Sequence, residues 1–137
     1  MQVEHPDSGA ILIAEHDQNV RELQRYFLGK SGFTVEFADD GRAALERARL
    51  VRPALIVTEI MIPLIDGLAL CRRLRDDPLT RDIPVVVFSF LAAEPRAREA
   101  GANAFLRKPL VESTFVATIQ GLIAPSAEKK EKQWASQ

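Results

Sequence analysis

The sequence of 137 residues has little of several features that would indicate particular classes of protein. Its one cysteine, Cys71, excludes an internal disulfide and leaves no second thiol for a cysteine metal site or a redox pair. Lysine and arginine number 18 against 19 aspartate and glutamate, so the net charge of −1 does not favour nucleic acid or an anionic membrane as a partner. No apolar run approaches the roughly 18 residues of a membrane span. We therefore expect a cytoplasmic protein that binds neither membranes nor nucleic acid.

The two ends of the sequence differ in composition from its centre. Residues 1–9 contain Glu4 and Asp7 and lack a basic stretch followed by an apolar one, so they do not resemble a signal peptide. Residues 125–137 are polar, and we expect them to be disordered. The sequence thus predicts an N-terminal extension over residues 1–9, one domain over residues 10–124, and a C-terminal tail over residues 125–137.

The central part alternates five times between a short apolar run and a segment of helical periodicity. The strand-like runs lie at residues 10–14, 34–38, 54–58, 84–88 and 104–106. Because parallel neighbours in a sheet need crossover connections, this alternation predicts an α/β fold with a five-stranded parallel sheet and helices on both faces.

Polar residues follow four of the predicted strands. Glu15 and His16 come after the first strand, Glu59 after the third, Ser89 after the fourth and Lys108 after the fifth. In an open parallel sheet, ligands bind outside the carboxyl ends of the strands. We therefore expect these five side chains to form the functional site.

Five ordered stretches of this sequence resemble the receiver domain of two-component response regulators, and the resemblance covers roughly residues 10–124. They are ILIAEHD (11–17), ADDG (38–41), LIVTEIMIPLIDG (55–67), IPVVVFS (83–89) and AGANAFLRKP (100–109). The resemblance implies a flavodoxin-like fold with strand order 2-1-3-4-5. It also implies a pocket that binds Mg²⁺ on acidic residues and accepts phosphate on an aspartate after the third strand, and protein partners such as a histidine kinase or a downstream effector.

The position equivalent to the phosphoacceptor departs from the family, because Glu59 stands where the family has an aspartate. The glutamate carboxylate extends one methylene further. A displacement of about 1 Å in a reacting group can lower a rate on the order of a hundredfold. We therefore expect no aspartyl phosphorylation, and a protein that is not an enzyme.

The acidic pair of the family is also incomplete, because His16 follows Glu15 where a second acidic residue is expected. Mg²⁺ prefers six oxygen ligands, whereas imidazole suits Zn²⁺, Cu²⁺ or Ni²⁺. Binding of Mg²⁺ should therefore be weak or absent, and no cofactor is expected. Glu15, His16 and Glu59 remain weak candidates for holding a softer metal. Lys108 can instead pair with Glu59 or Glu15 and partly neutralise the pocket.

The remaining matched positions concern the switch and the output surface. Ser89 keeps the switch hydroxyl of the family, but the bulky Phe90 follows it and should restrict the entry of a phosphodonor. Phe105 takes the aromatic position on the fifth strand and, having no hydroxyl, should lean inward. The resemblance also suggests a cis Lys108–Pro109 bond. The fourth helix should be shortened, because the segment between Ser89 and Gly101 is about three residues shorter than the family pattern. Three residues are nearly one helical turn.

The sequence leaves two functional hypotheses. The first is a degenerate receiver that signals through protein–protein interaction without aspartate phosphorylation, with a homodimer also considered. The alternative is a metal-dependent phosphotransfer receiver with an altered site made of Glu15, His16 and Glu59. The unusually apolar loop over residues 60–65 either seals the pocket or offers a surface to a partner, and the sequence does not choose between these.

Overall fold

The computed structural model describes residues 9–123. The predicted C-terminal tail, and the predicted N-terminal extension apart from Gly9, lie outside the described residues. The strands are β1 (Ile11–Ala14), β2 (Val35–Ala38), β3 (Leu55–Thr58), β4 (Val85–Ser89) and β5 (Ala104–Arg107). The helices are α1 (Gln18–Lys30), α2 (Gly41–Val51), α3 (Gly67–Asp76), α4 (Glu94–Ala100) and α5 (Glu112–Ile123).

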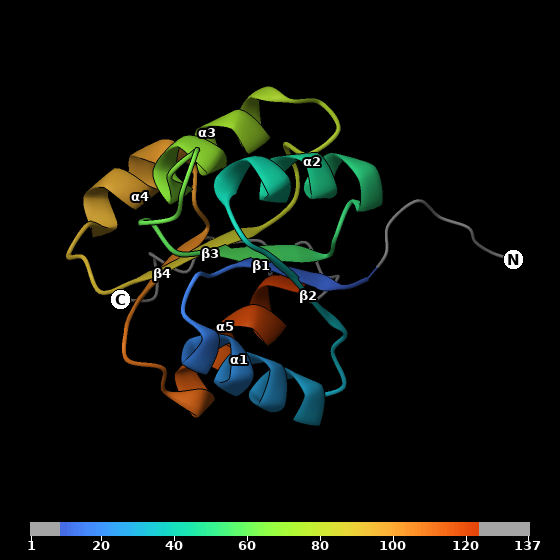
Figure 1. The fold of residues 1–137 in the computed structure, drawn as a ribbon, viewed down its shortest axis with the longest axis vertical. Coiled ribbons are helices and arrows are strands. Elements are labelled where there is room, and N and C mark those ends of the chain that lie inside the picture. Colours follow the sequence, from blue (N-terminus) through green and yellow to red (C-terminus); the bar gives the residue numbers. More distant parts are fainter. Residues whose placement is uncertain (1–8, 124–137) are drawn as a thin grey trace, which may run out of the picture.

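The five strands form one parallel sheet in the order β2-β1-β3-β4-β5, which confirms the predicted fold (Figure 1). In Figure 1, α1 and α5 lie below the sheet, and α2, α3 and α4 lie above it. All carboxyl ends of the strands therefore meet at one edge, where the loops leading into the helices begin. This edge is where the polar residues were expected to gather.

Successive residues of a buried strand enter two separate cores. In β1, Ile11 and Ile13 belong to the cluster between the sheet and helices α1 and α5. Leu12 and Ala14 belong to the cluster between the sheet and helices α2, α3 and α4. This follows from the two-residue period of a strand, which points adjacent side chains to opposite faces. Unbroken apolar runs are therefore required in a sheet that is covered on both faces.

Aspartates define where three of the helices begin. Asp17, Asp40 and Asp66 precede α1, α2 and α3, and each side chain accepts a hydrogen bond from a backbone N–H of the first turn. These caps give the loops at the carboxyl edge a defined exit direction. Because these three carboxylates cap helices, we do not count them among the candidate metal ligands.

Helix α4 has only seven residues, with Pro95 near its start and Gly101 at its end. It is therefore short, as expected from the length of this segment. The observed strands β1, β2, β3 and β4 each begin one residue later than predicted, although the Thr34 carbonyl still accepts from the Ile11 N–H at 2.8 Å. Within residues 9–123, no helix combines the length and apolar character needed to cross a membrane.

Candidate functional site

Three buried charged residues meet at the carboxyl edge of the sheet. Glu15 directly follows β1, Glu59 directly follows β3, and Lys108 directly follows β5. Their exposed fractions are only 2%, 7% and 8%. Strands β1 and β3 are neighbours, and the Glu59 N–H donates to the Ala14 carbonyl at 3.0 Å, so the two carboxylates leave the sheet side by side.

The Lys108 ammonium lies between the two carboxylates. Its Nζ is 2.9 Å from Oε2 of Glu59 and 3.1 Å from both carboxylate oxygens of Glu15, with the hydrogen bond directed to Oε2. One cation therefore faces two anions, which leaves the cluster with a formal charge of −1. Charges buried to this extent are tolerated because they are paired and hydrogen-bonded.

Burial and the two carboxylates shift the pKa of Lys108 in opposite directions. Burial favours the neutral amine and by itself lowers the pKa. Hydrogen bonds to Glu59 and Glu15, together with the negative charges of both carboxylates, outweigh the burial and raise the pKa above its ordinary value of 10.5. Lys108 is therefore a permanent cation at neutral pH.

The second oxygen of Glu59 is held by the backbone of its own loop. Oε1 accepts hydrogen bonds from the N–H groups of Ile60 at 2.5 Å and Met61 at 3.4 Å. Thr58 Oγ1 donates to the Glu59 carbonyl at 2.9 Å. Both ends of the carboxylate therefore have partners, one in Lys108 and one in the backbone, and the side chain is fixed where it lies.

Gly67 sets the position of the Glu59 backbone. A Cβ at Gly67 would overlap the carbonyl group of Glu59, which belongs to the backbone and cannot rotate away. The Gly67 N–H also donates to the Ile60 carbonyl at 2.8 Å. The first residue of α3 thus packs directly against the loop that carries Glu59, and only glycine permits this approach.

The switch residues surround this cluster without joining it. Ser89 Oγ accepts a hydrogen bond from the Leu91 N–H at 3.2 Å. The backbones of Ser89 and Lys108 are joined, since the Lys108 N–H donates to the Ser89 carbonyl at 3.0 Å, but the Ser89 hydroxyl has no hydrogen bond to the Glu59 or Lys108 side chain. The Lys108 Nζ lies 5.3 Å from the centre of the Phe90 ring, so Phe90 forms an aromatic wall beside the ammonium. Phe105 is half-buried and packs against the core beneath α2, α3 and α4. The Lys108–Pro109 bond is cis.

His16 does not take part in the cluster. It is exposed, and it makes no hydrogen bond or ion pair with any residue between 9 and 123. The carboxylate of Asp17 accepts hydrogen bonds from the N–H groups of Asn19 and Val20, at 2.8 and 3.2 Å. His16 is therefore an exposed neighbour of the buried cluster and not a member of it.

The donors present do not fit the Mg²⁺ site of a receiver. Such a site needs several oxygen ligands in octahedral geometry. Here Glu15 and Glu59 both bind Lys108, and the neighbouring His16 is exposed. Among the described residues, no group of three histidine, cysteine or acidic side chains is arranged to hold a metal ion. The set Glu15, His16 and Glu59, considered from the sequence, is thus not assembled.

Arg21 is a part of the site that the sequence analysis missed. Its Nε donates to the Glu15 carbonyl, and its Nη2 donates to the Ala38 carbonyl at 3.0 Å and to Asp39 at 2.8 Å. The guanidinium also lies 5.1 Å from the centre of the Phe37 ring. Arg21 therefore ties the loop after β1 to the loop after β2. Its place one helical turn into α1 was the only available signal.

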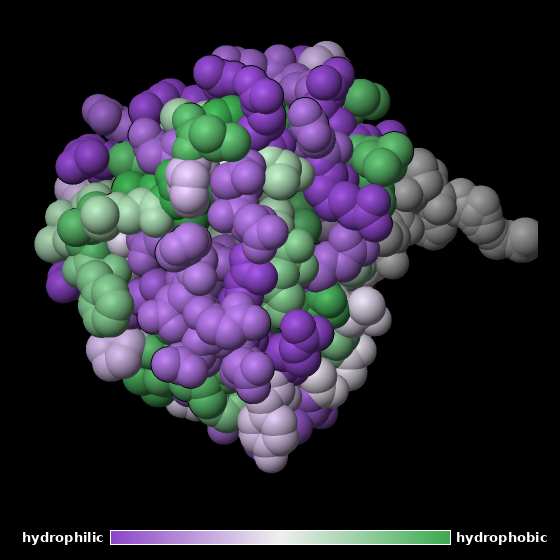
Figure 2. Space-filling view, viewed as in Figure 1, coloured by the Kyte–Doolittle hydropathy of each residue, from purple (hydrophilic) through white to green (hydrophobic). Residues whose placement is uncertain are grey.

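The loops at the carboxyl edge of the sheet carry an apolar rim. We use this name for Met61, Leu64, Phe90, Leu91 and Val111, which are five of the nine large hydrophobic residues that are exposed among those described. They lie on the loops after β3, β4 and β5, and Figure 2 shows apolar surface over the loop between β4 and α4, at the left edge. Concentrated apolar surface of this kind marks sites of protein interaction.

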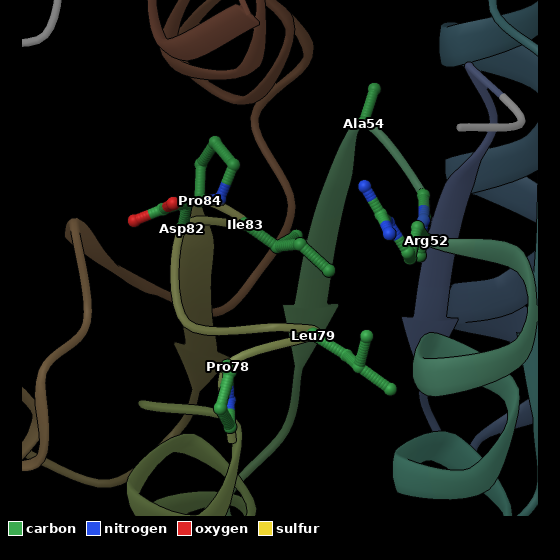
Figure 3. A pocket seen from close by; sticks show the side chains of 8 residues that line it. Arg52, Ala54, Pro78, Leu79, Asp82, Ile83 and Pro84 are labelled. Atoms are coloured by element: carbon green, nitrogen blue, oxygen red, sulfur yellow. The ribbon is translucent and has the colours of Figure 1, made fainter. Parts of the chain in front are cut away.

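A separate hollow of about 220 Å³ lies at the opposite edge of the sheet (Figure 3). It is lined by residues that precede β3 and β4, among them Arg52, Leu79 and Pro84. Asp82 also lines it, but its carboxylate points away from Arg52 (Figure 3). This hollow gathers no cluster of reactive side chains, so the carboxyl edge is the better candidate for the functional site.

Comparison with known proteins gives consistent matches. The sequence model of the response regulator receiver domain family matches residues 11–120 of this chain. The response regulator MprA of Mycolicibacterium vanbaalenii is 34% identical over 116 residues, which cover 82% of this chain and 49% of that protein. The chain therefore spans about half the length of the curated relatives it matches.

Solved structures agree with these matches. A structure described as a response regulator from Chloroflexus aurantiacus has a TM-score of 0.81 and 30% identity, covering 85% of this chain and 98% of the other. A receiver domain of a histidine kinase from Syntrophus aciditrophicus has a TM-score of 0.78 and 33% identity, covering 85% and 90%.

Proposed function

Because the chain belongs to the response regulator receiver domain family, we propose that it is a signalling module that works by protein–protein contact and does not undergo aspartyl phosphorylation. In this proposal its partners are proteins of a two-component pathway, a histidine kinase or a downstream effector. The pocket that other receivers use for chemistry serves here as a fixed internal support for the surrounding loops. No catalytic step is assigned to it.

One observation carries the proposal: Glu59 stands at the acceptor position and its carboxylate is fully engaged. Its Oε2 is 2.9 Å from the Lys108 ammonium, and its Oε1 accepts from the N–H groups of Ile60 and Met61. A phosphodonor would have to displace these partners before reaching the carboxylate. Phe90 stands beside the same ammonium and narrows the approach further.

The position of Ser89 favours a fixed surface over permanent mimicry of the phosphorylated state. A phosphoryl group carries nearly two negative charges and three acceptor oxygens, whereas a carboxylate carries about one charge and two oxygens. Both oxygens of Glu59 already have partners, and the Ser89 hydroxyl accepts from the Leu91 N–H instead. The switch hydroxyl is therefore not drawn toward Glu59, as a phosphoryl group would draw it.

Incubation with acetyl phosphate and Mg²⁺, followed by intact-mass measurement, tests the proposal. We expect the wild-type chain to gain no phosphoryl mass. A gain of one phosphoryl group that base hydrolyses would refute the proposal. Zn²⁺ and Mn²⁺ in place of Mg²⁺ test the metal-dependent alternative, since a metal that binds the native state must raise its melting temperature.

A restored variant serves as the positive control. Glu59→Asp, His16→Asp and Phe90→Ala together return the acceptor, the second acidic ligand and a small neighbour. We expect this triple variant to gain the phosphoryl mass under the same conditions. The two single exchanges Glu59→Gln and Phe90→Ala should not gain it, because neither supplies an aspartate at position 59.

A further inference from the structure

Helix α4, which lies beside α3 on one face of the sheet (Figure 1), contributes little apolar surface to the core. Its buried side chains are Ala97 and Ala100, preceded by the buried Ala93, whereas α3 buries three leucines and a cysteine. An alanine removes much less apolar area from water than a leucine does. Seven residues are also too few for a helix that is stable by itself. The folding of α4 therefore depends on its other contacts.

The amino end of α4 offers no strong contact of another kind. Ala93 stands before the helix, and its methyl group cannot accept a hydrogen bond from the N–H groups of the first turn. Arg98 and Glu94 approach to 3.6 Å on α4 itself, but both side chains are exposed, and such pairs contribute little. The carboxyl end of α4 differs, because a side chain of α3 contacts it.

Arg75 of α3 reaches the carboxyl end of α4. Its Nε donates to the Gly101 carbonyl at 2.9 Å, directly after the last helical residue. Its Nη1 donates to the carbonyls of Arg81 and Ile83, at 2.9 and 2.7 Å, and its Nη2 donates to Asn103 Oδ1 at 2.6 Å. Three hydrogen bonds therefore fix the guanidinium on the segments before β4 and β5, and the fourth attaches α4 to it.

Two local features maintain this geometry. Gly101 has a φ of 103°, in the left-handed region that favours glycine, and a Cβ there would lie 2.8 Å from Cγ of Arg75. Asn103 is anchored to Val85, the first residue of β4. Its N–H donates to the Val85 carbonyl at 2.8 Å, and its Oδ1 accepts from the Val85 N–H at 2.9 Å. Asn103 would thus keep holding the guanidinium if α4 left its place.

We propose that α4 opens as a local unit while the sheet and α3 stay folded, and that the hydrogen bond from Arg75 to Gly101 holds it closed. Opening breaks this bond and the hydrogen bonds of α4 itself, whereas the other three bonds of Arg75 remain. Segments with few buried apolar contacts open more readily than the whole fold. A partner that contacts folded α4 shifts the equilibrium toward the closed state, since a ligand favours the state that it binds.

This conformational device is separate from the buried cluster at the carboxyl edge of the sheet. Arg75 acts at the amino ends of β4 and β5, whereas Lys108 follows the carboxyl end of β5. The inference therefore goes beyond the proposed function, and it stands whether or not the chain accepts a phosphoryl group.

Hydrogen exchange of backbone amides, followed residue by residue by NMR on the full chain at neutral pH, tests the inference. The amides of Ala97 and Ala102 report on α4, because they donate to the carbonyls of Ala93 and Ala97 at 2.9 and 3.0 Å. The Ile56 amide donates to the Pro84 carbonyl at 2.9 Å within the sheet and reports on unfolding of the whole chain. We expect the α4 amides to exchange at least about tenfold faster than the Ile56 amide, after correction for intrinsic rates.

Substitutions at Arg75 separate its hydrogen bonds from its charge. Arg75→Ala removes both, and the α4 amides should exchange at least about tenfold faster than in the wild type. Arg75→Lys keeps the charge but has one donor atom in place of three, so its rates should lie between those of Arg75→Ala and the wild type. Circular dichroism melting curves verify that each variant is folded at the temperature of the measurement.

Arg73→Ala is the matched control. Arg73 is an exposed arginine of the same helix, and it has no hydrogen bond or ion pair with a residue between 9 and 123. Its replacement should change the exchange rates of the α4 amides by less than about twofold.

Four results would overturn the inference. They are α4 amides that exchange as slowly as the Ile56 amide, α4 rates that Arg75→Ala leaves unchanged, Arg75→Lys rates equal to those of the wild type, and equal effects of Arg75→Ala and Arg73→Ala. The first result needs no substitution, so it decides the matter even if Arg75→Ala does not fold. The proposed function fails by a different result, the gain of phosphoryl mass.

Discussion

The Lys108 ammonium lies 2.9 Å from Oε2 of Glu59, although Lys108 follows β5 and Glu59 follows β3. The other oxygen of the Glu59 carboxylate accepts from the backbone N–H of Ile60. Glu15 completes the arrangement at 3.1 Å. The pocket is therefore closed by side chains of the protein, and its stability should depend on all three.

Lys108→Met should destabilise the chain strongly. The substitution keeps an unbranched side chain of similar length but leaves Glu15 and Glu59 adjacent, buried and without their cation. Removing one partner of a buried ion pair costs about 3–5 kcal/mol. Urea unfolding at neutral pH followed by circular dichroism measures the loss.

A matched control is Lys30→Met, since Lys30 forms an ion pair with Glu112 at 3.0 Å in which both side chains are largely exposed. Such pairs contribute little, because water and salt screen them. We expect this variant to unfold at nearly the urea concentration of the wild type. Equal losses in the two lysine variants would contradict a special role for Lys108.

The contribution of Lys108 should disappear at alkaline pH. Its partners raise its pKa in the folded state above the ordinary value of 10.5, so the folded state holds this proton more tightly than the unfolded state. The resulting stability is fully present below the unfolded pKa and is lost as pH rises through the folded pKa. The difference in unfolding free energy between wild type and Lys108→Met should therefore be constant up to about pH 10 and shrink as the pH rises further. A difference that stays constant at higher pH would contradict the assignment.

Gly67→Ala should destabilise the fold through the backbone of Glu59. The new Cβ would overlap the Glu59 carbonyl, so α3 or the loop must shift, at a cost of about 3 kcal/mol. Gly29→Ala is the matched control, because a Cβ at Gly29 meets nothing within 4 Å and alanine is the better helix former. It should stabilise α1 by about 0.5–1 kcal/mol. Thermal unfolding of both variants measures the contrast, and a stable Gly67→Ala would show that the loop adapts.

The fold was predictable because its apolar runs are long enough and unbroken enough to require burial on both faces. Residues 54–58 and 84–88 were predicted as strands; the structure begins each of them one residue later and ends the second one residue later, at Ser89. Such a shift is small because Pro84 still contributes its carbonyl to the ladder, accepting from the Ile56 N–H at 2.9 Å. Strand ends depend on single hydrogen bonds that periodicity does not resolve.

The sequence placed three of the five expected site residues together, but it did not indicate the directions of the side chains. Strand order placed Glu15, Glu59 and Lys108 together, because carboxyl ends of parallel strands share one edge. The contacts of Arg21 join residues that are distant in the sequence, such as Phe37 and Asp39, and local periodicity does not reveal them.

Gln24→Met should stabilise the protein. Gln24 lies on the core-facing side of α1 and is 0% exposed, and neither its Oε1 nor its Nε2 has a partner among the described residues. Burying unpaired polar atoms is costly, and an apolar side chain of the same shape removes that cost. We expect a gain of about 1 kcal/mol, which corresponds to a rise in Tm of about 3–5 °C for a chain of this size. Gln120→Met, at an exposed position of α5, is the control and should change Tm little. A lower Tm for Gln24→Met in differential scanning calorimetry would mean that the amide has a buried partner, such as a bound water, whose hydrogen bonds the substitution breaks.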